Sequence, residues 1–482
     1  MIRNTQAGKI WPIIATGAGL FSDGYLNNVI GSVNTILSIM YPKQYKESTA
    51  TRNVSSIAFA GTVLGQLTFG FISDYYSRKH GMIMSSIILI LFSILCSGAW
   101  GAGGSIPGML AALTAYRFFI GIGIGGEYPA GSVACAEASN DMQKGSRNRW
   151  FVFFTNFMID FGFVVSSFVP LVLLWICSEH HLDTVWRVSL ALGAIPPMSI
   201  FYLRLKLQEP EQFTKNTIRR AETVPYWLII KFYWFRLTVV SLIWFIYDFS
   251  GYSFGLYSTT ILNAVIPDGS LYKTFGWGVV LNLFYLPGSF CGAIASDYLG
   301  PKITLAVGVW LQAIVGYIMA GLYSRLKDHI GAFVVVYGIF QTLGEFGPGD
   351  CIGLIASKSS ATAIRGQYYG IAAAVGKIGA FVGTYVFPII IRNAGGEDTV
   401  KGLQAPFWVS SSLCIVSGLM AIFLLPKLDQ DVISNEDERF RDYLQSQGWD
   451  VSQLGDGNTS NDEFVPEDGV ISSDYFEKKD SV

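Results

Sequence analysis

The sequence predicts an all-α membrane protein of twelve transmembrane helices arranged in two pseudo-symmetric six-helix bundles. Three observations predict this fold class. Hydrophobic residues make up 51% of the 482 residues and charged residues only 14%, whereas a soluble domain carries about 25% charged residues. About twelve long apolar runs follow one another along the chain, and a polar segment in the middle separates six of them from the other six.

Each apolar run is long enough to cross a bilayer as a helix. A helix rises about 1.5 Å per residue, so roughly 20 residues span the hydrocarbon core of about 30 Å. The runs lie at approximately 11–38, 53–73, 81–101, 109–136, 150–177, 186–204, 237–262, 274–297, 303–323, 331–356, 367–391 and 405–425.

These runs divide the chain into four parts. We predict an N-terminal six-helix bundle at 1–204, a linker loop at 205–236, a C-terminal six-helix bundle at 237–426 and a tail at 427–482. The tail is strongly acidic, a composition typical of disordered segments, so we expect it to be disordered in the cytoplasm.

Lys and Arg in the short loops predict the orientation, because cytoplasmic loops carry an excess of these residues. They gather before the first run, after the second and the fourth, and in the linker: Arg3, Lys9, Arg78, Lys79, Lys144, Arg147, Arg149, Arg204, Lys206, Lys215, Arg219, Arg220, Lys231 and Arg236. The segment 41–52 is also basic and counts against the rule. The balance still predicts that both termini are cytoplasmic.

Five of the ionisable side chains inside apolar runs are the strongest candidates for a functional site: Asp23, Glu127, Asp160, Asp248 and Lys377. Charge in hydrocarbon is costly, so such residues indicate function by default. All except Glu127 lie about 16 Å from the cytoplasmic end of their run, which brings four helices' charges to one depth. Buried ion pairs that merely hold helices together are the alternative. A converging set that includes one lysine favours a transport site instead.

Two aromatic residues flank one of these acids. Trp244, Asp248 and Tyr252 are spaced four residues apart, so they share one face of the seventh predicted helix. This face can present an acid between two aromatic rings to a central cavity.

The two halves repeat each other weakly at an offset of roughly 223 residues. The segment 74–79, after the second run, matches 297–302, after the eighth, and Glu127 falls on Asp350. Internal repeats of this kind are typical of transporters whose substrate site lies at the repeat interface near mid-membrane.

The loop cluster of Asp74, Arg78 and Lys79, with its counterpart Asp297, predicts a conformational latch. A loop acid can pair with basic residues or helix ends in one state and release them in the other. Arg117, in the outer half of the fourth run, precedes a ladder of glycines that permits close helix approach. It either tunes proton movement or bonds the backbone, and both interpretations stay open.

No enzyme chemistry is indicated. The six cysteines show no metal-ligand spacing, the four histidines lie in loops, and no Ser/His/Asp arrangement is evident. We therefore expect no enzyme activity, no metal and no cofactor beyond the proton as coupling ion. We also expect no nucleic-acid partner, and a monomer embedded in the lipid bilayer.

Short motifs occur in order along the chain: Gly19-Leu-Phe-Ser-Asp23-Gly-Tyr25, Gly70-x3-Asp74-x2-Ser77-Arg78-Lys79, Arg117 with Gly121, Gly123, Gly125 and Gly126, Glu127-Tyr128-Pro129, Trp244-x3-Asp248-x3-Tyr252, Gly347-Pro348 and Gly376-Lys377. Together they resemble the major facilitator superfamily and, within it, the phosphate:proton symporter branch. With Gly349-Asp350 after Gly347-Pro348, the pattern closely resembles the fungal glycerophosphodiester permeases.

The resemblance implies that Asp23 and Glu127 carry the coupled proton and that Lys377 pairs with the anion. It also implies a substrate-binding set: Tyr128, Asn156, Trp244, Asp248, Tyr252, Gly349 and Asp350. Leu26 and Gly349 stand where the phosphate carriers have polar side chains. Fewer polar contacts and more room favour a phosphate ester over inorganic phosphate.

The function that the resemblance implies is proton-coupled import of glycerophosphodiesters (glycerophosphoinositol, glycerophosphocholine or both) across the plasma membrane by alternating access. A phosphodiester carries one fixed negative charge, which Lys377 can offset in a site of reduced dielectric. An inorganic phosphate:proton symporter is the alternative. A nutrient receptor that does not transport is a further one, supported only by the acidic tail.

Overall fold

The computed structural model describes residues 6–219, 221–266, 270–396, 399–428 and 432–455, and within these ranges the regular elements are helices. The N-terminal half comprises α1 (Gln6–Gly17), α2 (Phe21–Met40), α3 (Ala50–Tyr75), α4 (Arg78–Ser97), α5 (Ile106–Gly126), α6 (Val133–Ser139), α7 (Arg147–Phe154), α8 (Asn156–Cys177), α9 (Leu182–Ala191) and α10 (Ile195–Lys206). The C-terminal half comprises α12 (Tyr226–Val265), α13 (Leu271–Leu283), α14 (Tyr285–Tyr298), α15 (Pro301–Leu326), α16 (Ile330–Gly344), α17 (Asp350–Lys358), α18 (Arg365–Asn393) and α19 (Val400–Leu424).

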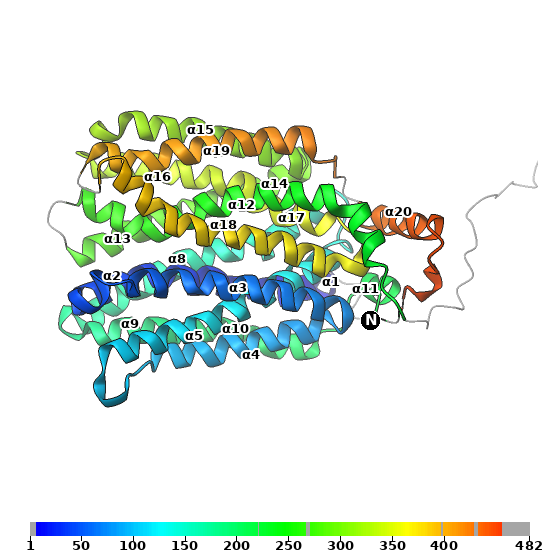
Figure 1. Cartoon of the computed structure of the whole chain (residues 1–482), viewed down its shortest axis with the longest axis horizontal. Helices are drawn as coiled ribbons and strands as arrows, with labels where there is room; N and C mark the ends of the chain where they lie inside the picture. Colours follow the sequence, from blue (N-terminus) through cyan, green and yellow to red (C-terminus); the bar gives the residue numbers. More distant parts are fainter. Residues whose placement is uncertain (1–5, 220, 267–269, 397–398, 429–431, 456–482) are drawn as a thin grey trace, which may run out of the picture.

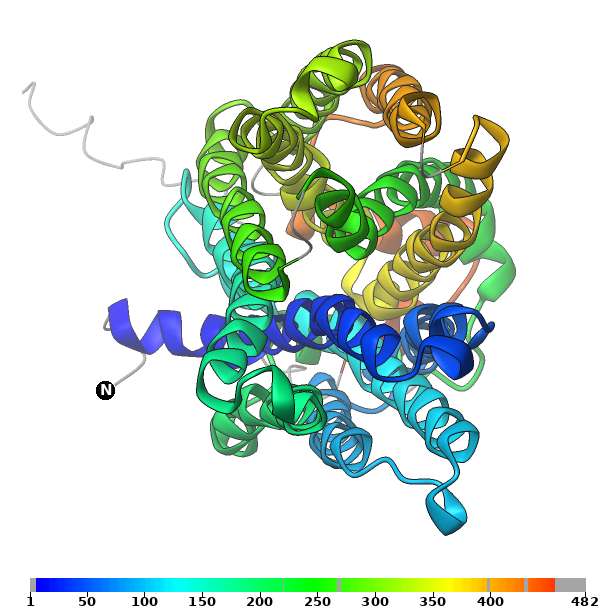
Figure 2. The same cartoon turned by 90° about the vertical axis from the view of Figure 1, so that its left-hand side faces the viewer.

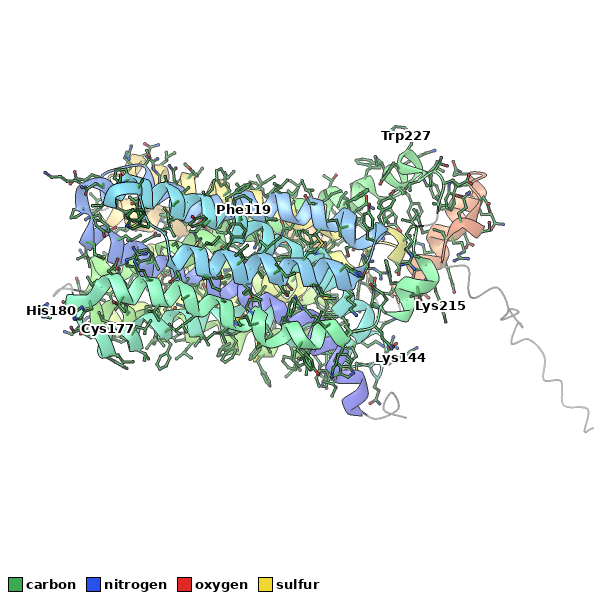
Figure 3. The ribbon with its side chains drawn as sticks, turned by 90° about the horizontal axis from the view of Figure 1, so that it is seen from below. Phe119, Lys144, Cys177, His180, Lys215 and Trp227 are labelled. Atoms are coloured by element: carbon green, nitrogen blue, oxygen red, sulfur yellow. The ribbon has the colours of Figure 1, made fainter. Side chains whose placement is uncertain are left out.

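The two halves lie side by side, with their long helices roughly parallel (Figure 1), and they enclose a central region seen end-on in Figure 2. The helices α11 (Glu211–Asn216) and α20 (Val432–Ser446) lie together at one end of the bundle, on the side of the N-terminus. We call this the linker end. Lys144 and Lys215 lie at the linker end and His180 at the opposite end (Figure 3).

Eleven helical passes of the described chain are long and apolar enough to cross a membrane. The first predicted run, 11–38, is not among them. It forms α1, a 3-10 turn (Ala18–Leu20) and α2 in succession. Polar residues such as Asp23, Asn27 and Asn28 make α2 less apolar. The predicted first pass is therefore present as a broken helix, which faces the protein interior with its polar side.

The outer surface of the bundle is apolar. Leu91, Ile94 and Phe423 are at least half exposed, and Phe119 is exposed about midway along the bundle (Figure 3). An exposed apolar surface of this extent is unusual for a soluble monomer. It fits contact with lipid.

Glycines allow α3 and α5 to pack backbone against backbone. A Cβ atom on Gly121 would lie 2.0 Å from the carbonyl oxygen of Ala58, and one on Gly61 would lie 2.0 Å from that of Phe118. No larger residue fits at either position without moving a helix. The predicted role of the glycine ladder after Arg117, close helix approach, is confirmed by this geometry.

Besides the π-helical turn Pro42–Lys46 after α2, each half contains a π-helical turn with a proline in its interior: Glu127–Ser132 between α5 and α6, and Glu345–Gly349 between α16 and α17. Proline lacks the N–H that an α-helical turn requires, and π turns are frequent at functional sites. The two turns with an interior proline begin with Glu127 and Glu345. By position in the turn Glu127 corresponds to Glu345, whereas the sequence offset pairs it with Asp350.

The linker and tail differ from their predicted description. The helix α12 already begins at Tyr226, inside the segment predicted as a loop up to 236. The tail, predicted to be disordered from 427, forms α20, whose Phe440 and Leu444 are buried against Tyr233 and Tyr368. The apolar residues of this acidic helix lie on one face and pack against the bundle, which the overall composition of the tail does not reveal. Residues 456–482 of the predicted tail lie outside the described residues.

Candidate functional site

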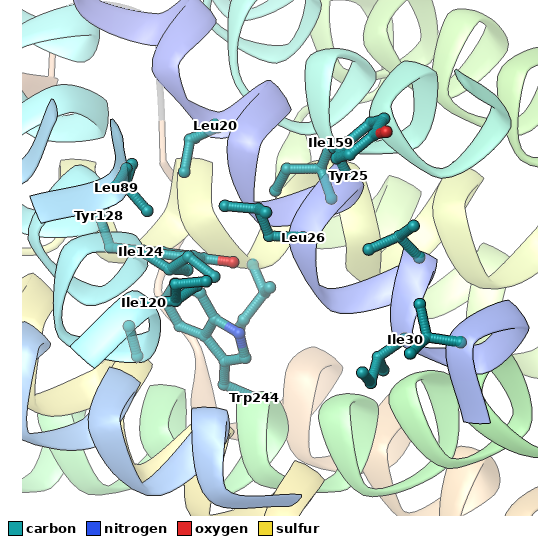
Figure 4. Close-up of a cluster of buried hydrophobic side chains, with 14 of the residues drawn as sticks. Leu20, Tyr25, Leu26, Ile30, Leu89, Ile120, Ile124, Tyr128, Ile159 and Trp244 are labelled. Atoms are coloured by element: carbon teal, nitrogen blue, oxygen red, sulfur yellow. The ribbon is translucent and has the colours of Figure 1, made fainter. Parts of the chain in front are cut away.

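A cavity with about 880 Å³ of atom-free space lies between the two halves. The N-terminal half contributes side chains from α2, α8 and the first π turn, and the C-terminal half contributes them from α12, α17, α18 and the second π turn. Tyr128 and Trp244, one from each half, line it and pack against each other with ring centroids 6.2 Å apart. Figure 4 shows the Tyr128 ring beside the Trp244 indole.

Lys377 occupies the centre of this site. Its Nζ atom lies 3.3 Å from Asp248 Oδ2 and 4.0 Å from Asp23 Oδ2. The same ammonium lies 3.7 Å from the ring centroid of Tyr252 and 5.1 Å from that of Tyr128. All three charged side chains are almost completely buried. One cation is thus held between two acids and two aromatic faces, at a depth where each charge needs a partner.

Asp23 accepts hydrogen bonds from three donors in addition to its contact with Lys377. Asn27 donates to its Oδ1 atom at 2.5 Å, Tyr252 donates to Oδ2 at 3.3 Å, and the hydroxyl of Tyr128 also donates to Oδ2. Tyr252 belongs to the opposite half, so its bond to Asp23 also joins the two halves beside the cavity.

A second group of acids lines another part of the cavity, and we call Asp160, Glu345 and Asp350 the acidic cluster. Asn156 donates from one amide to Asp350 at 2.9 Å, to Glu345 at 3.0 Å and to Asp160 at 3.5 Å. The Ser289 hydroxyl donates to Asp350 at 2.7 Å, and the Tyr247 hydroxyl donates to Glu345 at 2.9 Å.

Glu127 does not reach the cavity. Both of its carboxylate oxygens accept from the guanidinium of Arg204 at 2.6 Å, and the Ser85 hydroxyl donates to Oε1 at 2.6 Å. Glu127 and Arg204 are both fully buried. The structure therefore separates Glu127 from Asp23, the acid with which the sequence grouped it.

The predicted latch residues join the two halves at the linker end. Asp74 pairs with Arg78 at 2.5 Å and accepts from the backbone N–H groups of Gly366 at 2.8 Å and Gln367 at 2.7 Å, at the start of α18. Arg78 continues the network to Glu137 at 3.1 Å, which also accepts from Arg365 at 3.1 Å.

The symmetry-related acid makes an equivalent bridge. Asp297, in the C-terminal half, pairs with Arg149 of the N-terminal half at 2.6 Å and accepts from the backbone N–H of Asn148 at 3.1 Å. Lys79 uses only its backbone N–H in a described contact, to Glu209 at 3.3 Å. Asp74 and Asp297 thus occupy matching positions on the two sides of the linker end.

Arg117 bonds the backbone. Its Nε atom donates to the carbonyl of Val54 at 2.7 Å, and Nη1 donates to that of Leu26 at 3.2 Å. The geometry matches the second of the two interpretations left open by the sequence.

The structure does not place Leu26 and Gly349 as expected from the sequence, which predicted that they leave room and fewer polar contacts for a phosphate ester. Leu26 is fully buried in the hydrophobic core, outside the cavity lining. Gly349 lines the cavity, but a Cβ atom there would lie 2.1 Å from Glu345 Oε2 and 2.9 Å from the Tyr247 hydroxyl. The room left by Gly349 is therefore filled by the Glu345 carboxylate rather than left open for a ligand.

Sequence reasoning missed Glu345, Tyr247 and the partner network of Arg365 and Glu137. Glu345 and Glu137 could have been found, because the first lies inside the apolar run 331–356 and the second directly after the run 109–136. Tyr247 carries no such signal, since it is one of 24 tyrosines in the chain.

Two helical halves that span a membrane and share a charged cavity at their interface define a membrane transporter with the major facilitator fold. A sugar-bound structure of the proton:xylose symporter XylE from E. coli has this fold, with a TM-score of 0.75, 15% sequence identity and coverage of 90% of this chain and 99% of that chain. The chain matches the family described as "Sugar (and other) transporter" over residues 11–224 and 211–434, and it belongs to that family.

Relatives from Candida albicans are much more similar in sequence. The glycerophosphodiester transporter GIT2 is 55% identical over 96% of this chain and 87% of its own length, and the glycerophosphocholine permease GIT4 is 54% identical over 98% and 89%. The major glycerophosphoinositol permease GIT3 is 53% identical over 95% and 86%. An inorganic phosphate transporter from Oryza sativa is more distant, at 24% identity over 88% of this chain and 92% of its own length.

Proposed function

We propose that this protein is a proton-coupled importer of glycerophosphodiesters that works by alternating access at the plasma membrane. The observation that carries the proposal is the position of Lys377, buried in the cavity within 4.0 Å of two acids and beside two tyrosine rings. The similarity to diester permeases along nearly the whole chain supports the same substrate class.

The charges of the cavity explain how a monoanion would bind. The ionised carboxylates of Asp23 and Asp248 carry two negative charges, and Lys377 carries one positive charge. An incoming phosphodiester would therefore meet a net negative charge. A proton on Asp23 or Asp248 removes this excess and lets the phosphate oxygens replace a carboxylate as the partner of Lys377. Tyr128, Tyr252 and Trp244 offer donors and apolar faces to the rest of the ligand.

Asp23 is the better placed of the two expected proton carriers. It touches Lys377 and donors from both halves, so its protonation can change contacts between the halves. Glu127 is held by Arg204 through two short bonds and can take up a proton only if that pair separates. We therefore assign the coupling proton to Asp23 and treat Glu127 as the second candidate.

Alternating access requires the contacts at the linker end to form and break. We infer that the linker end faces the cytoplasm, which agrees with the basic residues of the loops there. The bridges made by Asp74 and Asp297 would then hold the cytoplasmic side together while the cavity loads from outside.

The test is uptake by proteoliposomes that contain the purified protein. Radiolabelled glycerophosphocholine and glycerophosphoinositol should accumulate only when the outside is more acidic than the inside. Unlabelled phosphate should compete more weakly than either unlabelled diester. Equal competition by phosphate would instead support the inorganic phosphate symporter, and absence of any accumulation would contradict transport of these compounds.

A further inference from the structure

The acidic cluster of Asp160, Glu345 and Asp350 forms no ion pair with a basic side chain of the described chain. Among the described residues, no lysine, arginine or histidine forms an ion pair with any of these three carboxyl groups, which are at most 5% exposed. They share donors from one amide and two hydroxyls. Three neighbouring buried carboxyl groups cannot all be ionised without a counter-charge, so protons or a bound cation must supply it.

Asp160 points to a ligand rather than to a purely structural role. It is completely buried, it lines the cavity, and its Oδ1 atom has no hydrogen-bond partner in the described chain. A native buried carboxylate oxygen is normally satisfied, so an unpartnered one that lines a ligand cavity marks a place for a donor or a cation.

The pseudo-symmetry of the fold strengthens this interpretation. Glu127 and Glu345 begin equivalent π turns, but only Glu127 is neutralised, by Arg204. The N-terminal half thus satisfies its acid internally and keeps it away from the cavity. In the C-terminal half, no described basic side chain forms an ion pair with Glu345, which lies in the cavity lining.

The surroundings suit an organic cation. Tyr247, Phe163 and Tyr285 line the cavity together with the acids, and aromatic faces attract quaternary ammonium groups. The Phe163 and Tyr285 rings pack with their centroids 5.2 Å apart. In the described residues, no group of acids, histidines and cysteines has the arrangement needed to ligate a metal ion.

We propose that the acidic cluster is the headgroup subsite of the cavity and that it selects a cationic headgroup, such as a quaternary ammonium. This inference rests on the proposed function, because it assigns the phosphodiester to Lys377. Tyr247 contacts the cluster and its neighbour Asp248 contacts Lys377, so α12 brings the two subsites together. The phosphate of a zwitterionic diester then contacts the Lys377 ammonium. Its cationic headgroup contacts the carboxylates of the acidic cluster. A diester with an uncharged headgroup leaves the cluster to be neutralised by protons.

The sharpest test compares two ligands that differ only in headgroup charge. Glycerophosphocholine is compared with its 3,3-dimethylbutyl analogue, in which a carbon atom replaces the quaternary nitrogen. Both compete with radiolabelled glycerophosphocholine for uptake by proteoliposomes containing the unaltered protein. We expect the charged ligand to compete roughly tenfold more strongly, the ratio that about 1.4 kcal/mol produces.

Three carboxyl-to-amide variants assign the effect to residues. Asp160→Asn and Glu345→Gln should each reduce the charged-to-uncharged preference severalfold. Asp183→Asn is the matched control, since Asp183 is half exposed and pairs with Arg187 outside the cavity. It should leave the preference unchanged.

The outcomes separate the inference from the proposed function. Equal competition by the two ligands in the unaltered protein, with diester uptake intact, overturns the headgroup subsite and leaves the function standing. An unchanged preference in both cavity variants overturns it as well. Failure of the unaltered protein to take up any diester would instead overturn the proposed function.

Discussion

The guanidinium of Arg204 and the carboxylate of Glu127 form a two-point ion pair, with both bonds 2.6 Å long and both side chains completely buried. Arg204 also donates to the carbonyl groups of Ala15 and Met82, so one side chain joins α10 to α1 and α4. A pair in this position has a structural role whether or not Glu127 also handles a proton.

Breaking this pair should destabilise the protein. Glu127→Gln leaves the Arg204 charge uncompensated in the interior, which costs about 3–5 kcal/mol when one partner of a buried pair is removed. We expect a lower thermal unfolding temperature in detergent and partial recovery in the double variant Glu127→Gln/Arg204→Met. A stable Glu127→Gln protein that has lost only proton-driven accumulation would show that Glu127 is a proton carrier after all.

Lys377 should be indispensable for binding. Lys377→Met keeps the length of the side chain but leaves Asp248 and Asp23 without their cation and removes the partner of the phosphate. Uptake at low substrate concentration should fall below detection. Adding Asp248→Asn should restore stability but not uptake, because it removes excess charge without supplying a cation. Near-normal substrate affinity in Lys377→Met would refute the assignment.

Asp23 should couple transport to protons. Asp23→Asn preserves an acceptor oxygen for Tyr128 and Tyr252 but cannot gain or lose the proton. We expect the variant to lose accumulation driven by a proton gradient while it still exchanges internal for external diester. We expect the exchange rate of the unaltered protein to rise with external acidity, and the variant should lack this rise. Asp183→Asn, which makes the same chemical change on an exposed acid, serves as the control. Proton-driven accumulation of normal size in Asp23→Asn would transfer the coupling role to another acid.

Asp74 should control the linker end. Asp74→Asn removes the charge that pairs with Arg78. Only the oxygen of the new amide is an acceptor, so one of the two bonds from the backbone N–H groups of Gly366 and Gln367 is lost. We expect the halves to separate more often there. Spin labels are attached at positions 144 and 299, two exposed residues of opposite halves, in a protein in which Cys291→Ser has removed an exposed native thiol. Pulsed electron paramagnetic resonance should then report a longer distance between the two labels. An unchanged distance distribution would mean that Asp74 does not hold this end together.

The sequence predicted the architecture and much of the site because membrane burial makes charge conspicuous. Asp23, Asp248 and Lys377 stand out in apolar runs, and the structure brings all three to one point. Depth arithmetic cannot say which face of a helix meets which neighbour. The family resemblance, and not the depth of the residues, grouped Glu127 with Asp23. Neither gave a hint that Arg204, from the other end of the same half, reaches Glu127.

Helical packing outside the membrane was also hidden from composition. The tail is acidic enough to be predicted as disordered, yet a few apolar side chains on one face of α20 suffice for docking. A carboxylate on that helix, Asp437, also accepts two hydrogen bonds from Thr362, in the 3-10 turn just before α18. Such contacts depend on shapes that only the assembled halves create.

Gly349 provides a further test, because the space beside it holds the Glu345 carboxylate and not a ligand. Gly349→Ala adds a Cβ atom at a point 2.1 Å from Glu345 Oε2, a contact that forces this flexible carboxylate to move. The move breaks its bonds to Tyr247 and Asn156 and disturbs the acidic cluster. Overpacking of this kind costs about 1–3 kcal/mol.

The expected result is selective, since the lost contacts belong to the headgroup subsite and Lys377 is unaffected. Gly349→Ala should weaken competition by glycerophosphocholine roughly tenfold, while competition by an uncharged diester changes less. Gly276→Ala, in α13, is the matched control, because its Cβ would meet no atom within 4 Å. The competition assay in proteoliposomes measures all three proteins side by side. If Gly349→Ala instead improves uptake of the larger diesters or leaves every affinity unchanged, Glu345 does not contact the headgroup, and the site lies entirely on the Lys377 side of the cavity.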